Sequence, residues 1–406
     1  MDSALNTAAR ALAAGDPLAA LDQVALRDDA FALALRGTAM AQLGELAEAD
    51  ALLRRAVQGF GGQEPLARAR CIVARTEVAV ARRELGTSPD GLGEAIAVLE
   101  DRGDRSNAIH GRLLELRWLL LLGRVDEAES KRAALVLRDA PPVLEAIGHL
   151  VAADIAVRRV RAGAAAQALE AATKAAARLG IGALSAEIAV ALDQLRRPAA
   201  RMRVRGVERV VGLAEVEALL ASSAVVVDAC RRAVGPMSSV RSLARRPVLL
   251  SLVVALAEAW PGDVDREHLL ARVFEAGVGN ESWRVRLRVE VGRLRKVVEG
   301  FATVEATARG YVLRAAAEAE VVVLLPPVDG NNAAVLAVLA DGAPWSTSAL
   351  AMALGVSQRS VQRALATLEA EGRVQPFGRA RARRWVAPTA SGFTTALLLP
   401  RVEPGR

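Results

Sequence analysis

Six basic side chains recur at helical spacing in one segment of the second half of the chain, and their chemistry suits a nucleic acid. Arg284, Arg288 and Arg295 follow at i, i+4 and i+11, so on a helix they share a face that a DNA major groove could accept. Arg286 and Arg293 are seven residues apart and form a second stripe, better placed for phosphates. The full set is Arg284, Arg286, Arg288, Arg293, Arg295 and Lys296.

The apolar residues of this segment predict which of its faces is buried. Val285 and Val289, together with Leu294 and Val298, are expected to face a core. The alternative to nucleic-acid contact is a solvated basic face whose arginines pair with acidic neighbours. Those neighbours are Glu281, Glu290 and Glu299.

A second group of side chains suited to base edges lies in residues 358–363. Arg donates to guanine, Gln pairs with adenine, and Ser contacts either base edges or phosphates. Val361, Leu365 and Leu368 are spaced to bury one face of a helix, which leaves the polar residues facing outward. The outward residues are Gln358, Arg359, Ser360, Gln362 and Arg363.

Alternating arginines follow in residues 378–385. Every second side chain of a β-hairpin shares a face, so three of these arginines would together face phosphates or the minor groove of an A·T-rich site. They are Arg379, Arg381 and Arg383. A solubilising loop is the alternative, and Trp385 is expected to plug the core beneath the hairpin.

Catalytic and metal-binding patterns are missing from the sequence. It has no glycine-rich phosphate loop, nucleophile elbow or His/Cys/Asp cluster at metal-ligand spacing. Cys71 and Cys230 are expected to be separate core thiols. We therefore expect neither enzymatic activity nor a cofactor or bound metal.

Charge is distributed unevenly along the chain. Residues 1–200 contain 25 basic and 26 acidic residues, a net of −1, so the remainder carries the other 28 basic and 20 acidic residues, a net of +8. Of the 53 basic residues 50 are arginine, whose planar guanidinium matches phosphate and guanine. A neutral module joined to a nucleic-acid-facing one fits this asymmetry. The 3% aromatic content favours closely packed helices.

The elements expected around the first basic group form an ordered set. A helix opens at Arg245-Arg246-Pro247, a second begins at the N-cap Asp265, a third covers 282–299, and two strands follow at 303–307 and 310–313. This order resembles the OmpR/PhoB-type winged helix, also used by actinobacterial antibiotic regulators. The matching segments are 246–250, 261–270, 287–296 and 307–311.

That resemblance implies roles for two parts of the segment. Residues 282–299 would be the recognition helix, and Arg309 at the wing tip would touch the DNA backbone or minor groove. The sequence departs from the family at Gly292, which costs up to about 1 kcal/mol of helix stability relative to Ala, and at Arg288, where an acid is usual.

A helix-turn-helix pattern surrounds the second polar group. Helices are expected at 333–339, 349–354 and 358–371, with Gly355-Val356-Ser357 as the turn. Gly355 allows a positive φ, Val356 is expected to fill the gap between helices, and Ser357 caps the third helix. Residues 350–365 resemble the helix-turn-helix of many bacterial regulators, and 368–374 resembles the start of a wing in MarR- and IclR-like proteins.

The first half of the chain carries a recurring signature of Gly followed by Ala five residues later. A Gly turn lets one helix fold back on another, and the small Ala permits close packing. The copies are Gly15–Ala20, Gly44–Ala49, Gly123–Ala128 and Gly163–Ala168, with a fifth that ends at Ala95 after an insertion. The pattern resembles the tetratricopeptide repeat (TPR), best at residues 35–56, and a helical bundle is the alternative. The resemblance implies a surface for a peptide or protein partner, and a spacer or dimerisation body is nearly as well supported.

Together these patterns predict a mainly α protein with an N-terminal TPR-like α-solenoid followed by two winged helix-turn-helix domains. The expected boundaries are 1–200, 201–320 and 321–388, with a tail at 389–406 that docks on a neighbouring surface. We expect a cytoplasmic transcriptional regulator that binds double-stranded DNA sequence-specifically as a homodimer, with no membrane contact. The alternative is an interaction scaffold whose winged helices bind proteins.

Overall fold

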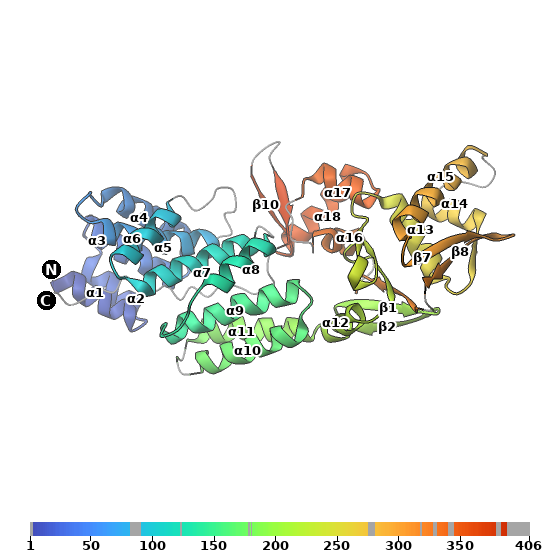
Figure 1. Ribbon diagram of the computed structural model, residues 1–406. Helices are drawn as coiled ribbons and strands as arrows, with labels where there is room; N and C mark the ends of the chain where they lie inside the picture. Colours follow the sequence, from blue (N-terminus) through green and yellow to red (C-terminus); the bar gives the residue numbers. More distant parts are fainter. Residues whose placement is uncertain are drawn as a thin grey trace.

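The computed structural model describes residues 3–81, 91–121, 124–177, 179, 181–274, 281–316, 319–327, 331–339, 345–378 and 383–387. Within these ranges the chain is mainly α-helical with small sheets, as expected. The molecule is elongated, with the N-terminal helices at one end and the unit that carries the first basic group at the other (Figure 1). No helix in the described ranges has both the length and the apolar content needed to cross a bilayer.

Eleven consecutive helices occupy the described parts of the first half. Each packs mainly on its neighbours in sequence, with α3 against α4 and α9 against α10 among the closest pairs. Their bounds are α1 Ser3–Ala13, α2 Pro17–Val24, α3 Ala30–Gln42, α4 Leu46–Gly59, α5 Pro65–Ala81, α6 Leu92–Asp101, α7 Arg105–Leu121, α8 Val125–Ala134, α9 Pro142–Arg158, α10 Ala162–Ala176 and α11 Gly182–Arg196.

One type of helix ending recurs between these helices. Gly15, Gly44 and Gly103 adopt positive φ values of 78°, 87° and 73°, and the next N–H donates to the carbonyl five residues earlier, as in a Schellman ending. The bonded pairs are Asp16–Ala11, Glu45–Met40, Asp104–Leu99, Arg124–Leu119 and Arg161–Ala156, at 2.8–2.9 Å. Ala20 and Ala49 are fully buried, so the predicted packing role of these alanines is confirmed.

The fourth copy of the signature has a different register from the expected one. Gly163 lies inside α10, and the left-handed residue is Val160, with φ of 55°. The buried alanine is Ala165, whereas Ala168 is only half-buried. A valine rarely adopts this conformation, so the residue type at position 160 does not predict a turn there. Gly123 lies outside the described residues, while Ala95 and Ala128 are buried.

A six-stranded sheet follows the helices, in the order β2-β1-β9-β3-β4-β5. Arg205 and Gly206, both with positive φ, turn the chain between β1 and β2. The run of arginines from Arg196 through Arg209 is typical of a linker in the sequence, but its residues 200–211 form this β-hairpin. The strands are β1 Ala200–Val204, β2 Val207–Val211, β3 Val225–Asp228, β4 Ala233–Gly235, β5 Arg241–Ser242 and β9 Val321–Leu325, with α12 Leu213–Ala221 between β2 and β3.

Strand β9 lies in the middle of this sheet, although its residues were expected to begin the third domain. It pairs antiparallel with β1 and parallel with β3, and Val321–Leu324 are almost completely buried. The expected boundary at residue 320 therefore falls inside the sheet. The signal for a buried strand is the apolar run itself.

The first basic group belongs to a three-helix unit with a small sheet of order β6-β8-β7. Its core continues into the large sheet, because Val225 and Leu243 belong to the same cluster as Leu252 and Leu294. The elements are α13 Pro247–Glu258, β6 Asp263–Asp265, α14 Arg266–Phe274, α15 Glu281–Val298, β7 Ala302–Ala306 and β8 Gly310–Ala315. Asp265 Oδ1 accepts the Glu267 N–H at 2.8 Å, as expected of an N-cap.

The last unit contains three helices and a short hairpin. Val361, Leu365 and Leu368 are buried, as predicted, and the turn has φ of +68° at Gly355. Val356 is 41% exposed, so the prediction that it fills the gap between helices is wrong. The elements are α16 Asn331–Leu339, α17 Thr347–Leu354, α18 Gln358–Ala370, β10 Gln375–Phe377 and β11 Arg384–Val386.

The hairpin of this last unit is packed against the N-terminal half. Val386 and the half-buried Phe377 share a core cluster with Val80, Trp118 and Leu121. In Figure 1, β10 accordingly lies above the middle of the molecule, beside α5 and α7. The other side of the unit contacts the start of α13, where a Cβ on Gly355 would lie 3.6 Å from Pro247.

Candidate nucleic-acid interface

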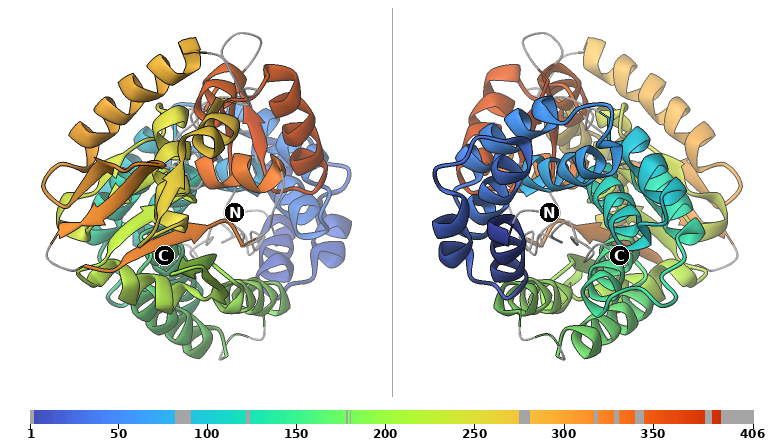
Figure 2. Two further views of the ribbon diagram at one scale, coloured as in Figure 1. Left: turned by 90° about the vertical axis from the view of Figure 1, so that its right-hand side faces the viewer. Right: turned by 90° about the vertical axis from the view of Figure 1, so that its left-hand side faces the viewer.

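Helix α15 is held from beneath by one buried stripe. Leu287, Val291, Leu294 and Val298 are each at most 2% exposed. Val285 and Val289 are 49% and 48% exposed, so the prediction that they face the core is wrong. Figure 2 shows α15 at the periphery of the molecule, where its opposite face meets solvent.

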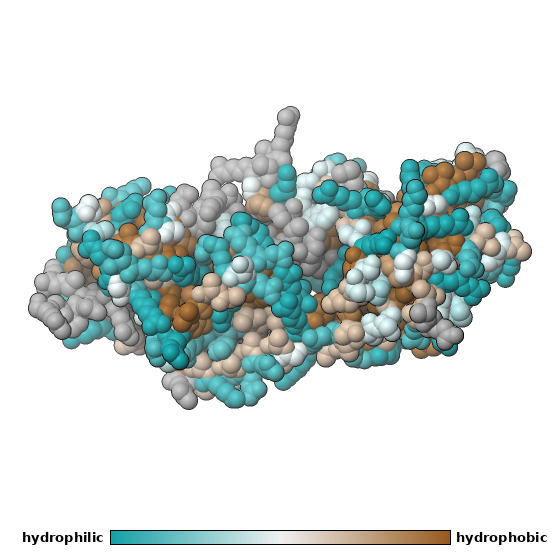
Figure 3. Space-filling view, viewed as in Figure 1, coloured by the Kyte–Doolittle hydropathy of each residue, from teal (hydrophilic) through white to brown (hydrophobic). Residues whose placement is uncertain are grey.

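All six basic residues predicted on this helix are exposed. At 100° per residue, Val285, Val289, Gly292 and Lys296 lie along the centre of the exposed face. Two rows of arginines flank this centre, with Arg284, Arg288 and Arg295 on one side and Arg286 and Arg293 on the other. In Figure 3, hydrophilic and hydrophobic residues alternate over this end of the molecule.

Two of these arginines form ion pairs, as the solvated-face alternative expects. Arg284 Nη2 lies 2.7 Å from Glu267 Oε1, and Arg293 Nη1 lies 2.7 Å from Glu290 Oε1. The arginine side chains are 45% and 63% exposed. The Arg284–Glu267 pair is solvent-accessible on both sides and contributes at most about 1 kcal/mol, so a phosphate can replace its carboxylate at little cost, whereas Glu290 is buried and would lose this partner.

Aromatic and backbone contacts orient two further arginines. The Arg286 guanidinium lies 5.0 Å from the ring centroid of Phe274 and 5.1 Å from that of Trp283, which is cation–π geometry. Arg295 Nε donates to the Val304 carbonyl at 2.7 Å and ties α15 to β7. Both contacts leave the side chains at the exposed surface.

The tip of the β7–β8 hairpin is strongly braced. Arg266 donates to the carbonyls of Thr307 and Ala308, each at 2.9 Å, and Thr307 Oγ1 donates to Asp263 Oδ2 at 2.6 Å. Gly310 leaves no room for a side chain, since a Cβ there would lie 1.8 Å from the Val264 carbonyl oxygen. Arg309 is exposed at this tip, where it was expected.

Two supporting residues were missed at the sequence level. Arg266 braces the hairpin tip, and Arg241 binds the C-terminal end of α15 by donating to the carbonyls of Lys296 and Glu299, at 2.9 and 2.8 Å. Both act on carbonyls far away in sequence, so local pattern gives no signal for them. A cation at a helix C-terminus also interacts favourably with the negative end of the helix dipole.

Helix α18 exposes its predicted polar residues. Gln358, Arg359, Gln362 and Arg363 are exposed, and Ser360 is half-buried. Ser357 Oγ accepts the Ser360 N–H at 3.1 Å, which confirms the predicted N-cap. Among the residues that the structure describes, no carboxylate forms an ion pair with Arg359 or Arg363. These two cations are therefore available on the helix surface.

The hairpin after α18 differs from the expected free arginine wing. Arg383 lies 4.6 Å from the Trp385 ring centroid and 3.7 Å from Glu369 Oε1, so it faces its own unit. Trp385 is 6% exposed and donates from Nε1 to Thr347 Oγ1 at 3.0 Å, which confirms its predicted core position. Arg379 and Arg381 lie outside the described residues.

The predicted side chains thus fall into two separate surfaces. One combines α15 with Arg309 at the far end of the molecule, and the other lies on α18 nearer its middle (Figure 1). Cys71 and Cys230 are free thiols whose pKa values burial raises to about 12, so they stay protonated. The described residues contain no His, Cys, Asp and Glu group able to hold a metal ion.

Comparison with known proteins gives no relative for this chain. No protein-family model matches it, and searches of curated proteins and of solved structures return no significant match.

Proposed function

We propose that this protein is a sequence-specific DNA-binding transcriptional regulator, with two winged-helix readers joined to a TPR-like helical half. The observation that carries the proposal is the exposed face of α15, where five arginines flank a helix centre that contains Lys296. The three helices and braced hairpin of this unit follow the order of an OmpR/PhoB-type winged helix. The width of an α-helix with its side chains matches the width of the DNA major groove.

The centre and the edges of α15 suit different parts of the duplex. Val285 and Val289 would contact thymine methyl groups in the groove, and Gly292 lets the helix backbone approach the base edges. The flanking arginines would bind phosphates on both groove walls or the O6 and N7 atoms of guanine. Arg309 would contact the backbone or the minor groove.

Helix α18 would read a second, shorter element. Gln358, Arg359, Gln362 and Arg363 have the donor and acceptor types for adenine and guanine edges. Because both readers belong to one chain, binding of the first raises the effective concentration of the second. A bipartite site within one stretch of duplex is therefore the expected target, in the cytoplasm, and the helical half would bind a protein partner or a second copy of the chain.

One observation favours a second function for the last unit. Phe377 and Val386 of its hairpin already pack on Trp118 of the helical half, so this unit uses its wing for a protein contact. An interaction scaffold would use both units in that way. The exposed α15 surface argues against this for the middle unit, because neither its valines nor its arginines are covered.

Selection of bound sequences from a random duplex pool, followed by fluorescence anisotropy on the selected site, tests the proposal. We expect saturable binding that weakens steeply with salt, by about 0.9 in log–log slope for each phosphate contact. The control for a general loss of positive charge replaces the exposed Arg54 and Arg55 of α4 by Ala together. This variant should leave the affinity for DNA and the salt-dependence slope unchanged. Absence of saturable binding at low salt would overturn the proposal.

A further inference from the structure

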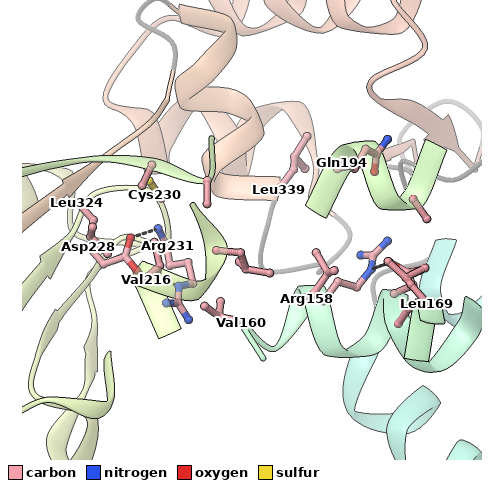
Figure 4. Close-up of a pocket in the computed structure, with 18 of the residues that line it drawn as sticks. Arg158, Val160, Leu169, Gln194, Val216, Asp228, Cys230, Arg231, Leu324 and Leu339 are labelled. Carbon is pink, nitrogen blue, oxygen red and sulfur yellow. Dashed lines mark hydrogen bonds and ion pairs between the residues drawn. The ribbon is translucent and has the colours of Figure 1, made fainter. Parts of the chain in front are cut away.

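A cavity of about 310 Å³ lies where the three parts of the molecule meet. Helices α9, α10 and α11 of the helical half form one side, and α12 with strands β3 and β9 forms the other. Leu339 at the end of α16 and Ala387 after β11 close it from the last unit. Figure 4 shows labelled side chains from these elements around one common space. This volume is within the range of small-molecule sites.

Most of the cavity wall is apolar. The larger apolar residues come from both sides of the junction, so the lining does not belong to a single core cluster. They are Leu150, Val157, Leu169, Val216, Leu324 and Leu339. Such a lining favours the hydrocarbon body of an organic molecule over water.

Two arginines supply the polar groups of the cavity, and each is held by an aspartate. Arg158 Nε lies 3.1 Å from Asp154 Oδ1, and Arg231 Nε lies 2.9 Å from Asp228 Oδ2. The Asp228 carboxylate also accepts the backbone N–H of Arg231 at 2.8 Å. These contacts fix the guanidinium groups through their inner nitrogens and leave outer nitrogens for another acceptor.

One of those outer nitrogens is buried and unsatisfied. Arg231 Nη2 has no hydrogen-bond partner in the part of the chain that the structure describes, although solvent does not reach it. A buried donor without an acceptor costs about 1–3 kcal/mol, more when it is charged. The Arg231 side chain as a whole is 36% exposed and lines the cavity, so a carboxylate placed there can accept from the guanidinium, whose geometry it matches best.

We infer that this cavity binds a small, largely apolar carboxylic acid, with its carboxylate on Arg231 and its hydrocarbon body among the apolar residues. Because all three parts of the chain line the cavity, the acid contacts the helical half, the region of the six-stranded sheet and the last unit at once. A ligand that prefers this arrangement stabilises it by mass action. Ligand binding does not depend on the proposed function, whereas any effect on DNA binding does.

Calorimetric titration of the full-length protein without DNA tests the inference, with sodium octanoate as the probe and 1-octanol as its uncharged match. We expect saturable octanoate binding that is at least tenfold tighter than octanol binding. Arg231→Lys keeps the charge but loses the second guanidinium nitrogen, and should weaken octanoate binding at least tenfold. Ala191→Phe, which fills the cavity from a half-exposed position on α11, should abolish binding.

The control is Arg197→Gln, an exposed residue of the same helical half that pairs with Asp193 and does not line the cavity, and it should bind octanoate as the wild type does. Circular dichroism of each variant confirms that it is folded. Lack of octanoate binding to the wild type, equal binding of octanol, or unchanged binding in Ala191→Phe would each overturn the inference. None of these outcomes concerns DNA binding, so the proposed function is judged separately.

Discussion

The middle and last units present similar helices in opposite settings. Helix α15 is buried along one stripe, its end is held by Arg241, and Arg309 at the tip of the hairpin beside it is exposed. Helix α18 also exposes its polar face, but its hairpin is packed on Trp118 of the helical half. The basic helix and the tip of the hairpin are thus both exposed in the middle unit, whereas in the last unit the hairpin is packed on the helical half. On this basis, α15 is expected to contribute most of the affinity and α18 to refine the choice of site.

Removing exposed basic residues from the two helices should give the largest difference. Replacement of Arg286, Arg288 and Lys296 by Ala together should weaken binding to the selected site about 10²–10⁴-fold, because each contact is worth about 1–2 kcal/mol. Arg359→Ala with Arg363→Ala should weaken it only about tenfold. Anisotropy titrations measure both, and equal losses would break the comparison.

The Gly310→Ala variant tests how the β7–β8 hairpin is braced. The added Cβ would overlap the Val264 carbonyl, so the hairpin must shift, at a cost of about 3 kcal/mol in the free energy of unfolding. Urea denaturation measures this change. Gly292→Ala is the matched control, since a Cβ there meets no atom within 4 Å, and it should leave stability equal or slightly higher.

The docked hairpin makes a different prediction. Trp118→Ala and Val386→Ala should be coupled by about 1 kcal/mol in a double-mutant cycle, because the two side chains share a cluster. Chemical denaturation of the wild type, both single variants and the double variant provides the cycle. Strictly additive effects would show that the hairpin is not held there in solution.

The smallest effect is expected from the ion pairs of α15. Glu267→Gln removes the partner of Arg284 and should change stability by less than about 1 kcal/mol, since the pair is exposed. DNA binding should tighten two- to threefold, because Arg284 no longer has to give up the Glu267 carboxylate when it contacts a phosphate. Weaker binding in this variant would mean that Glu267 orients Arg284 for its contact.

The sequence predicted the helices and wing strands well, because their signals are local. Capping by Asp265 and Ser357, the turn at Gly355 and the buried stripe of α18 were each evident from neighbouring residues. The face of α15 was predicted wrongly, since Val285 and Val289 have the same helical spacing as the residues that are buried. The stripe with Val285 and Val289 differs from the buried stripe only in which of them faces the core, and spacing alone does not reveal this.

Apart from the β1–β2 hairpin, the missed features depend on partners distant in sequence. Hairpin β1–β2 looked like a linker because Arg201 and Arg203 dominate it, yet both arginines pair with Glu208 on the opposite strand. Strand β9 finds its place only beside β1 and β3, about 100 residues earlier. The cavity also draws on residues from three parts of the chain, so no single segment could reveal it.

The central position of β9 limits how this chain can be divided or recombined. A cut at residue 320 would remove the strand that joins β1 to β3, so the sheet would split and the middle unit would lose the floor of its core. A cut after Leu325 keeps that sheet whole. The segment from β1 to β9, which includes the first proposed reader, should therefore be inherited, transplanted or fused as one block, with any natural exchange of parts occurring beyond Leu325.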